Sequence, residues 1–241
     1  MKTVLIYVLS SVKPPYGEMI RTAQETWDAE PLDGTRTVFY CGKPVVGNTS
    51  RIVSFPVEDE LLSVGRITVA AFAHALGQWQ WDYLARPNIS CYVHKKRLLT
   101  HCQSLPDRCV IQGVACGPTW VCGIQRPFLW GGGQFILSRD VVENLVGQQH
   151  KWQHSLMEDV AISELAQGCG YALDGTGRMC SLNKNGAGWD VISYGGKPGF
   201  SFVDWKDVSK IDDQFFLRVK HDPDRSVDSM VMRLLKQHLP P

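Results

Sequence analysis

The segment Trp130–Arg139, with the sequence W-G-G-G-Q-F-I-L-S-R, constrains the fold of this chain more than any other. Three consecutive glycines let the backbone approach a ligand closely, because no Cβ stands in the way. The apolar run 135–137 predicts a short buried strand, and Ser138 then fits the N-cap of a helix. Farther along, Glu158 and Asp159 come at the predicted start of another helix, where a carboxylate can face a cleft.

Strands alternate with helices through the first half of the chain, which is typical of a parallel α/β sheet. The run Val4–Leu9 is apolar on both strand faces, as expected of a central parallel strand. The same patterns predict further strands at 37–40, 52–55, 82–86 and 109–112, and helices at about 18–27, 60–77 and 95–104.

In the second half of the chain, strands and helices alternate less regularly. This half predicts strands near Trp120 and Phe135, a helix at 138–147, a polar loop at 148–154 and a helix that begins at Ser155. Residues 183–200 hold five glycines with little apolar periodicity, which predicts a long mobile loop. A last strand is expected at 215–220. The helix after it places apolar residues at helical spacing, namely Val227, Met230, Val231, Leu234 and Leu235.

Composition bounds the class of protein. The chain has 241 residues, 44% of them hydrophobic, which fits one large α/β domain or two small ones. A net charge of +1 gives no nucleic-acid-binding footprint, and no apolar stretch is long enough to span a membrane. The eight cysteines include no C-x-x-C pair, and the N-terminus lacks a signal-peptide cleavage site. We therefore expect reduced, mostly buried thiols.

The order of these motifs resembles the Fringe and β-1,3-galactosyltransferase type of glycosyltransferase. In that family a Gly-Gly-Gly strand and a Glu-Asp-Val helix start bracket the acceptor site, as Gly131–Arg139 and Glu158–Val160 would here. The segment 21–27, R-T-A-Q-E-T-W, is similar to the family's R-x-A-I-R-E-T-W helix with one residue missing. The resemblance spans most of the chain, from about residue 3 to residue 170.

The resemblance implies a GT-A-type α/β fold, a Rossmann-like mixed sheet flanked by helices in a single domain. About 1–112 would form the nucleotide-sugar half and about 113–241 the acceptor half. The implied reaction is inverting transfer of a hexose or deoxyhexose from a nucleotide-diphosphate sugar, with a UDP-sugar favoured, to a glycan hydroxyl. Golgi members carry an anchor and a stem. Their absence from this sequence predicts a cytoplasmic, stand-alone enzyme of bacterial or viral origin.

The two adjacent acidic residues are the expected catalytic pair. The resemblance marks Asp159 as the general base that deprotonates the acceptor hydroxyl. Glu158 has an alternative reading, because Ser155-Leu156-Met157-Glu158 fits a capping box in which Glu158 reaches back to the Ser155 N–H. On that reading, Glu158→Gln would cost about 1 kcal/mol or less of stability.

The donor side departs from the family. Where the family has D-D-D or D-x-D, this chain has Asn88, Ile89 and Ser90. Amide and hydroxyl oxygens carry no charge, so they would bind Mn²⁺ or Mg²⁺ only weakly. We therefore expect no tightly held metal, with Asn88, Ser90 and the preceding Arg86 as donor-binding residues. The alternative is a strand end where Asn88 and Ser90 bond only to the backbone.

Without carboxylates to hold a metal, fixed cations must balance the diphosphate. Lys220 and His221, with Arg218 before them, follow a predicted strand near the C-terminus and are expected to bind phosphate oxygens. The alternative is an ordinary solvated strand face. Ser10 and Ser11, at the end of the first strand, lie where an open α/β sheet binds a nucleotide, and they complete the donor-binding set.

The acceptor site is expected at Gly131, Gly132 and Gly133, with Trp152 and Trp189 stacking on sugar faces, although most tryptophans are core residues. The sequence bears on two rival functions. Nucleotidyl transfer would need a glycine-rich phosphate loop after the first strand, which Ser10–Pro15 lacks. A catalytically inactive glycan- or nucleotide-binding protein of the same fold remains the alternative, because of Asn88-Ile89-Ser90.

The missing carboxylates predict that activity persists in EDTA. A site that does not depend on a divalent ion should keep substantial turnover after chelation, measured as release of the nucleoside diphosphate from a nucleotide sugar. Complete loss of activity with EDTA, and recovery on adding Mn²⁺, would contradict this expectation.

Overall fold

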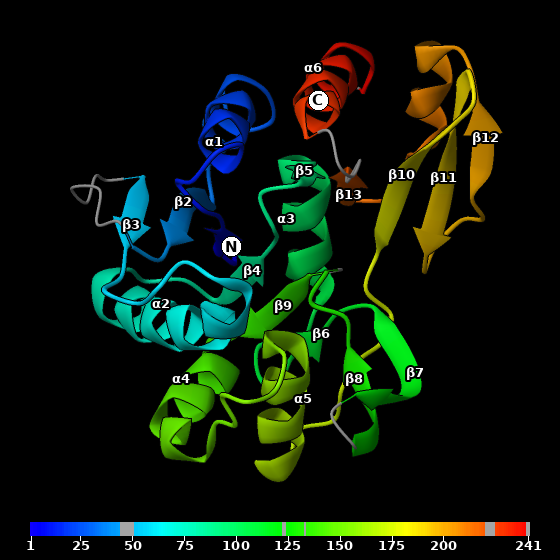
Figure 1. Cartoon of the computed structure of the whole chain (residues 1–241). Coiled ribbons are helices and arrows are strands. Elements are labelled where there is room, and N and C mark those ends of the chain that lie inside the picture. Colours follow the sequence, from blue (N-terminus) through cyan, green and yellow to red (C-terminus); the bar gives the residue numbers. More distant parts are fainter. Residues whose placement is uncertain (44–50, 122–123, 133, 220–224, 240–241) are drawn as a thin grey trace.

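Strand β1 (Val4–Leu9) forms the centre of a six-stranded mixed sheet (Figure 1). β1 pairs in parallel with a neighbour on each side, and the last two strands of the sheet run antiparallel to their neighbours. The spatial order is β3 (Ile52–Ser54), β2 (Thr35–Cys41), β1, β4 (Tyr83–Arg86), β9 (Phe135–Ser138) and β6 (Ile111–Gln112).

The computed structural model describes residues 1–43, 51–121, 124–132, 134–219 and 225–239, with only the backbone of 117–121 and 124–126.

A second sheet of five strands packs beside the first. Its spatial order is β12 (Phe200–Phe202), β11 (Gly188–Tyr194), β10 (Met179–Asn185), β13 (Phe216–Val219) and β5 (Cys91–Val93). A separate two-stranded ribbon is formed by β7 (Ala115–Val121) and β8 (Ile124–Leu129). The two halves of the chain exchange strands, since β9 pairs with β4 in the first sheet and β5 pairs with β13 in the second.

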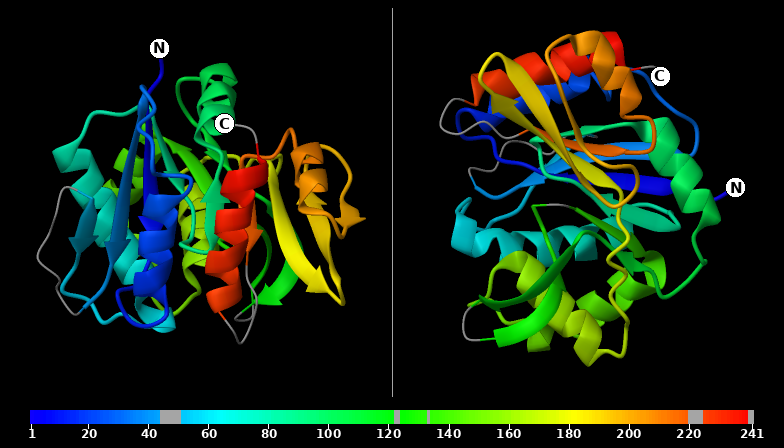
Figure 2. Two further views of the ribbon diagram at one scale, coloured as in Figure 1. Left: turned by 90° about the horizontal axis from the view of Figure 1, so that it is seen from above. Right: turned by 90° about the vertical axis from the view of Figure 1, so that its right-hand side faces the viewer.

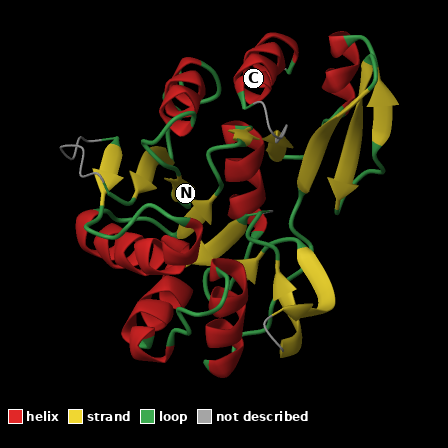
Figure 3. Cartoon of the chain, viewed as in Figure 1, coloured by secondary structure: helices red, strands yellow, loops and turns green. Residues whose placement is uncertain are grey.

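Helices cover both faces of the first sheet (Figure 3). On one face α1 (Tyr16–Glu25) and α6 (Ser226–His238) lie side by side (Figure 2), joined by ion pairs from Arg233 to Glu18 and Glu25 at 3.4 Å each. On the other face lie α2 (Val64–Gln78), α4 (Arg139–Gly147) and α5 (Glu158–Gly168). α3 (Lys95–Ser104) follows β5, and 3-10 turns occupy Leu61–Ser63, Gln149–Lys151 and Trp205–Lys210.

The apolar run of β1 accounts for these two layers. Val4, Ile6 and Val8 point into the core beneath α1 and α6, whereas Leu5 and Tyr7 point into the core beneath α2. Because both faces are buried, β1 has no polar alternation. The prediction of one mixed α/β domain flanked by helices is confirmed. Within the described residues, no helix is long and apolar enough to cross a membrane.

The segment 183–200 is not a mobile loop, contrary to the prediction from its glycines. It contains the end of β10, all of β11 and the start of β12, which pair antiparallel. Gly186, Gly195 and Gly196 have φ values of 56°, 72° and 76°, so these glycines supply the left-handed turns between strands. On β11, the alternate residues Trp189 and Val191 are buried.

Two further expectations change. The helix predicted from Ser155 begins at Glu158, after an extended Met157 that makes no side-chain cap. On α6, Val231 and Leu235 are buried as predicted, but Met230 is 47% exposed.

The hairpin placement predicts that Trp189 is a core residue. Trp189 is 6% exposed and its ring centroid lies 5.5 Å from that of Trp205. Trp189→Ala should therefore lower the free energy of unfolding by about 3–5 kcal/mol, because it removes a large buried side chain. Denaturant unfolding measures this loss.

Ile192, on the same strand and 43% exposed, provides the matched control. Ile192→Ala should change stability by less than about 1 kcal/mol. Equal, small effects for the two variants would contradict the core position of Trp189.

Candidate active site

The carboxyl ends of β1 and β4 meet at the point where the order of the parallel strands reverses. Beyond β1, the Leu9 N–H donates to the Pro87 carbonyl and the Ile89 N–H donates to the Leu9 carbonyl, both at 2.9 Å. These bonds place Leu9 opposite Asn88, so Ser10 and Asn88 lie at the ends of adjacent strands. Open α/β sheets bind their ligands at such a switch point, and these two of the predicted donor residues lie there.

Arg86, the last residue of β4, carries a fully buried guanidinium. It is 1% exposed and forms an ion pair with the Glu158 carboxylate, which is also buried. It donates to the Gly131 carbonyl at 2.9 Å and to the Tyr40 hydroxyl at 3.4 Å. The Thr68 hydroxyl donates to Glu158 Oε1 at 2.6 Å. Since the guanidinium is enclosed and paired, Arg86 is a positioning residue, and its predicted contact with the donor is not available.

The capping box predicted for Glu158 is wrong. Its side chain turns away from Ser155 toward Arg86 and Thr68, because an enclosed guanidinium requires a counter-charge. Burial raises the pKa of Glu158 above its usual value, an effect that Arg86 and the Thr68 hydroxyl oppose. Burial also raises the pKa of Tyr40 to about 12, so its hydroxyl stays neutral beside the pair.

Gly131 connects this buried pair to Asp159. Its carbonyl accepts from Arg86, and from Asn88 Nδ2 at 3.3 Å, while its N–H donates to Asp159 Oδ2 at 2.9 Å. The other carboxylate oxygen of Asp159 accepts the Val160 N–H at 2.9 Å. A Cβ on Gly131 would lie 2.7 Å from the Asp159 Cβ. The glycine is therefore required for the carboxylate to approach the turn.

The next residue, Gly132, brings a cation to the same turn. A Cβ there would lie 2.0 Å from Arg218 Nη1 and 2.6 Å from the Trp130 ring. The Arg218 guanidinium lies 4.8 Å from the centroid of Trp130, a cation–π contact. Two of its nitrogens, Nε and Nη1, are enclosed without a hydrogen-bond partner among the described residues.

Arg218 belongs to a positive region. Burial lowers the pKa of its guanidinium, and the nearby Arg225 and Arg86 act in the same direction. Arg225 itself pairs with Asp228 at 2.7 Å and lies over the Tyr16 ring. An enclosed guanidinium with unpaired N–H groups is costly unless an anion satisfies it. The basic cluster predicted from the sequence thus includes Arg218, whereas Lys220 and His221 lie outside the described residues.

The two serines at the end of β1 bond within the protein. The Ser10 hydroxyl donates to the Tyr40 carbonyl at 3.0 Å, and Ser10 is buried. The Ser11 hydroxyl donates to Asp59, a residue that sequence reasoning missed, and Lys13 Nζ donates to the Asp59 carbonyl at 2.9 Å. Ser11 is partly exposed, so it is the serine that can still meet a ligand.

The turn 88–90 does not fit a divalent cation. Asn88 directs its amide nitrogen to Gly131, Ile89 is apolar, and the Ser90 carbonyl accepts the Val219 N–H at 2.7 Å. Ser90 is 4% exposed. The turn offers no carboxylate, and the chemistry of its donors is poor for Mn²⁺ or Mg²⁺.

The structure brings together only part of the predicted acceptor set. Gly131 and Gly132 lie beside Asp159, and Gly133 lies outside the described residues. Trp152 and Trp189 are 5% and 6% exposed and belong to opposite cores, so neither offers a face for sugar stacking. Trp130, partly buried beneath Arg218, is the tryptophan that borders the site.

A cavity of about 540 Å³ lies away from this turn and is lined from α3 and from the segments that precede β10 and β13. Asp159 and Arg218 are brought together at the turn and not at this cavity. The candidate active site is therefore defined by Ser11, Asn88, Gly131, Gly132, Asp159 and Arg218.

The fold is shared with a glycosyltransferase. A solved structure described as a glycosyltransferase involved in the glycosylation of the major capsid of PBCV-1 superimposes with a TM-score of 0.55 and 13% sequence identity. The match covers 95% of this chain and 99% of that chain. No protein-family model and no curated protein matches the sequence. At this identity, the likeness shows the fold alone.

The buried pair predicts a large cost for Glu158→Gln. The substitution leaves the Arg86 guanidinium enclosed without its counter-charge, so the free energy of unfolding should fall by about 3–5 kcal/mol. Denaturant titration of the variant against the parent measures this loss. Arg86→Met combined with Glu158→Leu removes both charges and should recover much of it.

Glu143→Gln is the control, because Glu143 pairs with Arg139 on the surface at 2.9 Å. Its cost should be below about 0.5 kcal/mol. A cost of about 1 kcal/mol or less for Glu158→Gln would instead match the loss of a simple helix cap.

Proposed function

We propose that this chain is an inverting glycosyltransferase that moves a hexose or deoxyhexose from a nucleotide-diphosphate sugar, with a UDP-sugar favoured, to a glycan hydroxyl. The observation that carries the proposal is the turn Trp130–Gly132, which holds Asp159 at one glycine and Arg218 at the next. Inverting transfer needs a base for the acceptor and a cation for the leaving group. One turn presents both.

In this mechanism Asp159 accepts the proton of the acceptor hydroxyl. The acceptor oxygen attacks the anomeric carbon from the side opposite the diphosphate, and the bond between that carbon and the diphosphate oxygen breaks. The electron pair leaves with the diphosphate, whose charge the Arg218 guanidinium stabilises. The backbone contacts of Asp159 fix its carboxylate, and Gly132 leaves room over Trp130 for the Arg218 guanidinium.

The two parts of the proposed site come from the two halves of the sequence. Residues of about 1–112 supply the end of β1 and the turn at Asn88, which would bind the nucleotide sugar. Residues of about 113–241 supply Gly131, Asp159 and Arg218, which would face the acceptor and the diphosphate. No step passes through a metal, because the turn 88–90 lacks carboxylates.

The turn 88–90 supports a second candidate function. This candidate is a protein of the same fold that binds a nucleotide or a glycan without transferring sugar. The observation that favours it is again the absence of carboxylates at Asn88-Ile89-Ser90. Incubation with nucleotide sugars distinguishes the candidates, since only the enzyme releases the nucleoside diphosphate.

Asp159→Asn should lower turnover by orders of magnitude, because an amide cannot accept the acceptor proton. Nucleotide affinity and melting temperature should change little, since the amide oxygen can still accept the Gly131 N–H. Release of the nucleoside diphosphate measures turnover. Glu143→Gln, on the surface of α4, is the control that should keep parental turnover; near-normal turnover in Asp159→Asn would refute the assignment.

Arg218→Ala should weaken binding of the nucleoside diphosphate by about tenfold or more, since a charge-assisted hydrogen bond to phosphate contributes about 1.5–3 kcal/mol. The free nucleoside, which lacks phosphate, should bind the variant and the parent equally. Calorimetric titration with UDP and uridine measures both affinities.

Arg108→Ala removes an arginine whose side chain is 81% exposed and should leave both affinities unchanged. Equal losses for uridine and UDP in Arg218→Ala would indicate damage to the fold. No loss for either ligand would place the diphosphate elsewhere, next to Ser11 and the turn after β1.

A further inference from the structure

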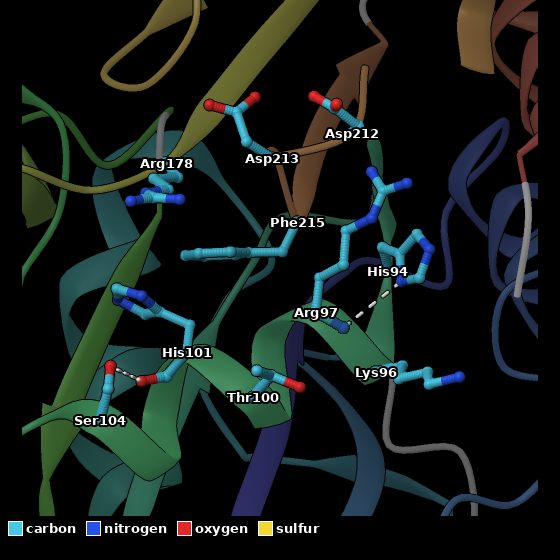
Figure 4. A pocket seen from close by; sticks show the side chains of 10 residues that line it. All are labelled: His94, Lys96, Arg97, Thr100, His101, Ser104, Arg178, Asp212, Asp213 and Phe215. Carbon is cyan, nitrogen blue, oxygen red and sulfur yellow. Dashed lines mark hydrogen bonds between the residues drawn. The ribbon is translucent and has the colours of Figure 1, made fainter. Parts of the chain in front are cut away.

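The 540 Å³ cavity is separate from the candidate active site. It opens beside α3, and Phe215, which comes directly before β13, lies at its centre (Figure 4). Arg218 is three residues farther along this strand, roughly 10 Å at the usual rise per residue. A volume of this size falls within the range of about 300–1,000 Å³ of small-molecule sites.

The partly exposed ring of His101 lies at the floor of this cavity. It packs on the buried ring of Phe215, with centroids 4.8 Å apart. His101 Nε2 lies 2.6 Å from Gln112 Oε1, and Gln112 Nε2 donates to Asp174 Oδ2 at 2.7 Å. Gln112 is 2% exposed, so this chain of bonds fixes the orientation of the imidazole from below.

Burial lowers the pKa of His101, and the nearby Arg178 acts in the same direction against the bond from Gln112. The imidazole is therefore neutral at pH 7. In the neutral imidazole Nε2 donates to Gln112 Oε1, so Nδ1 is left as an acceptor that suits a hydroxyl.

The walls carry donors and acceptors in fixed places. Arg97 Nη1 donates to the carbonyls of Ile211 and Gln214, which anchors a guanidinium that still has further N–H groups. Across from it, Asp212 and Asp213 each use one oxygen to bind Lys197, at 2.6 and 2.7 Å, and each keeps a second oxygen.

Arg178 is exposed and has no ion pair or hydrogen bond with any residue that the structure describes. Figure 4 shows its guanidinium above His101 and beside the Phe215 ring, facing the hollow. Lys96, by contrast, extends away from the hollow in the same view. Arg178 is therefore the free donor group of the cavity.

The balance of charges selects the kind of ligand. Two guanidinium groups face two carboxylates, so a phosphate would meet Asp212 and Asp213, and a cation would meet Arg97 and Arg178. A ligand with many hydroxyls can donate to the carboxylates and accept from the guanidinium groups at once. The apolar face of a sugar ring can also lie on the partly exposed His101 ring.

We propose that this cavity binds a neutral saccharide, a mono- or disaccharide unit, through Arg97, Arg178 and Asp213 over the ring of His101. The site does not rest on the proposed transfer reaction. It would hold a sugar unit at a distance from Asp159.

The test is NMR titration of the ¹⁵N-labelled full chain with methyl glycosides of glucose, galactose and mannose, and with maltose. At least one saccharide should shift the amide signals of α3 and of residues 178 and 212–215, and the shifts should persist in Asp159→Asn. Inorganic phosphate is the charged probe and should leave these signals unmoved.

Arg178→Ala should weaken the binding of that saccharide by about tenfold, the effect of losing a hydrogen bond to a charged group. Because Arg178 is exposed and unpaired, the fold should be unaffected. Arg21→Ala, which removes a cation 69% exposed on α1, is the matched control and should bind as the parent does.

Three results would overturn the proposal. Saccharides that move no signal at any soluble concentration would leave the cavity without its ligand. Phosphate shifting these signals in place of saccharides would make it an anion site. Shifts confined to residues 130–132 and 158–160 would place sugar binding at the candidate active site alone, whatever the outcome for transfer activity.

Discussion

The buried ion pair between Arg86 and Glu158 fixes the relative positions of the segments that form the candidate active site. It connects the end of β4 to the first residue of α5 beneath the sheet, and Thr68 of α2 joins it through the Glu158 carboxylate. A buried ion pair stabilises the folded state little more than a well-packed apolar contact would, but removing one of its partners destabilises the fold strongly. Its value here is geometric, because the same guanidinium also holds the Gly131 carbonyl.

From this pair the arrangement passes outward through one residue, Gly131. Arg86 holds its carbonyl, and its N–H donates to the Asp159 carboxylate. Gly132 then leaves the space that Arg218 occupies over Trp130. A structural charge below the turn thus orients the Asp159 carboxylate, and the next glycine leaves space for the Arg218 guanidinium. The acidic neighbours Glu158 and Asp159 have different tasks, and burial beside different partners separates them.

Sequence reasoning succeeds where a local pattern decides the structure. The apolar run of β1, the strand β9 with its following helix and the helix α3 all follow from short-range periodicity. It fails where distant residues decide. Arg86 and Glu158 are 72 positions apart, so a local capping box was the nearest available explanation for Glu158. The glycines of 183–200 predict mobility, whereas Gly186, Gly195 and Gly196 serve turns of a sheet that is completed by the distant strands β13 and β5. No spacing in the sequence brings His101, Arg178 and Asp213 together.

The exchange of strands between the halves has a mechanical consequence. β9 comes from the second half but completes the first sheet, and β5 comes from the first half but forms the edge of the second. A hinge motion between the halves would break the pairing of β4 with β9 or of β5 with β13. The two halves therefore cannot open and close as separate units. A fragment ending before β9 would leave the free edge of β4 unpaired and prone to aggregate. Any ligand of the turn 130–132 would therefore have to enter and leave by movement of loops and side chains, with both sheets kept intact.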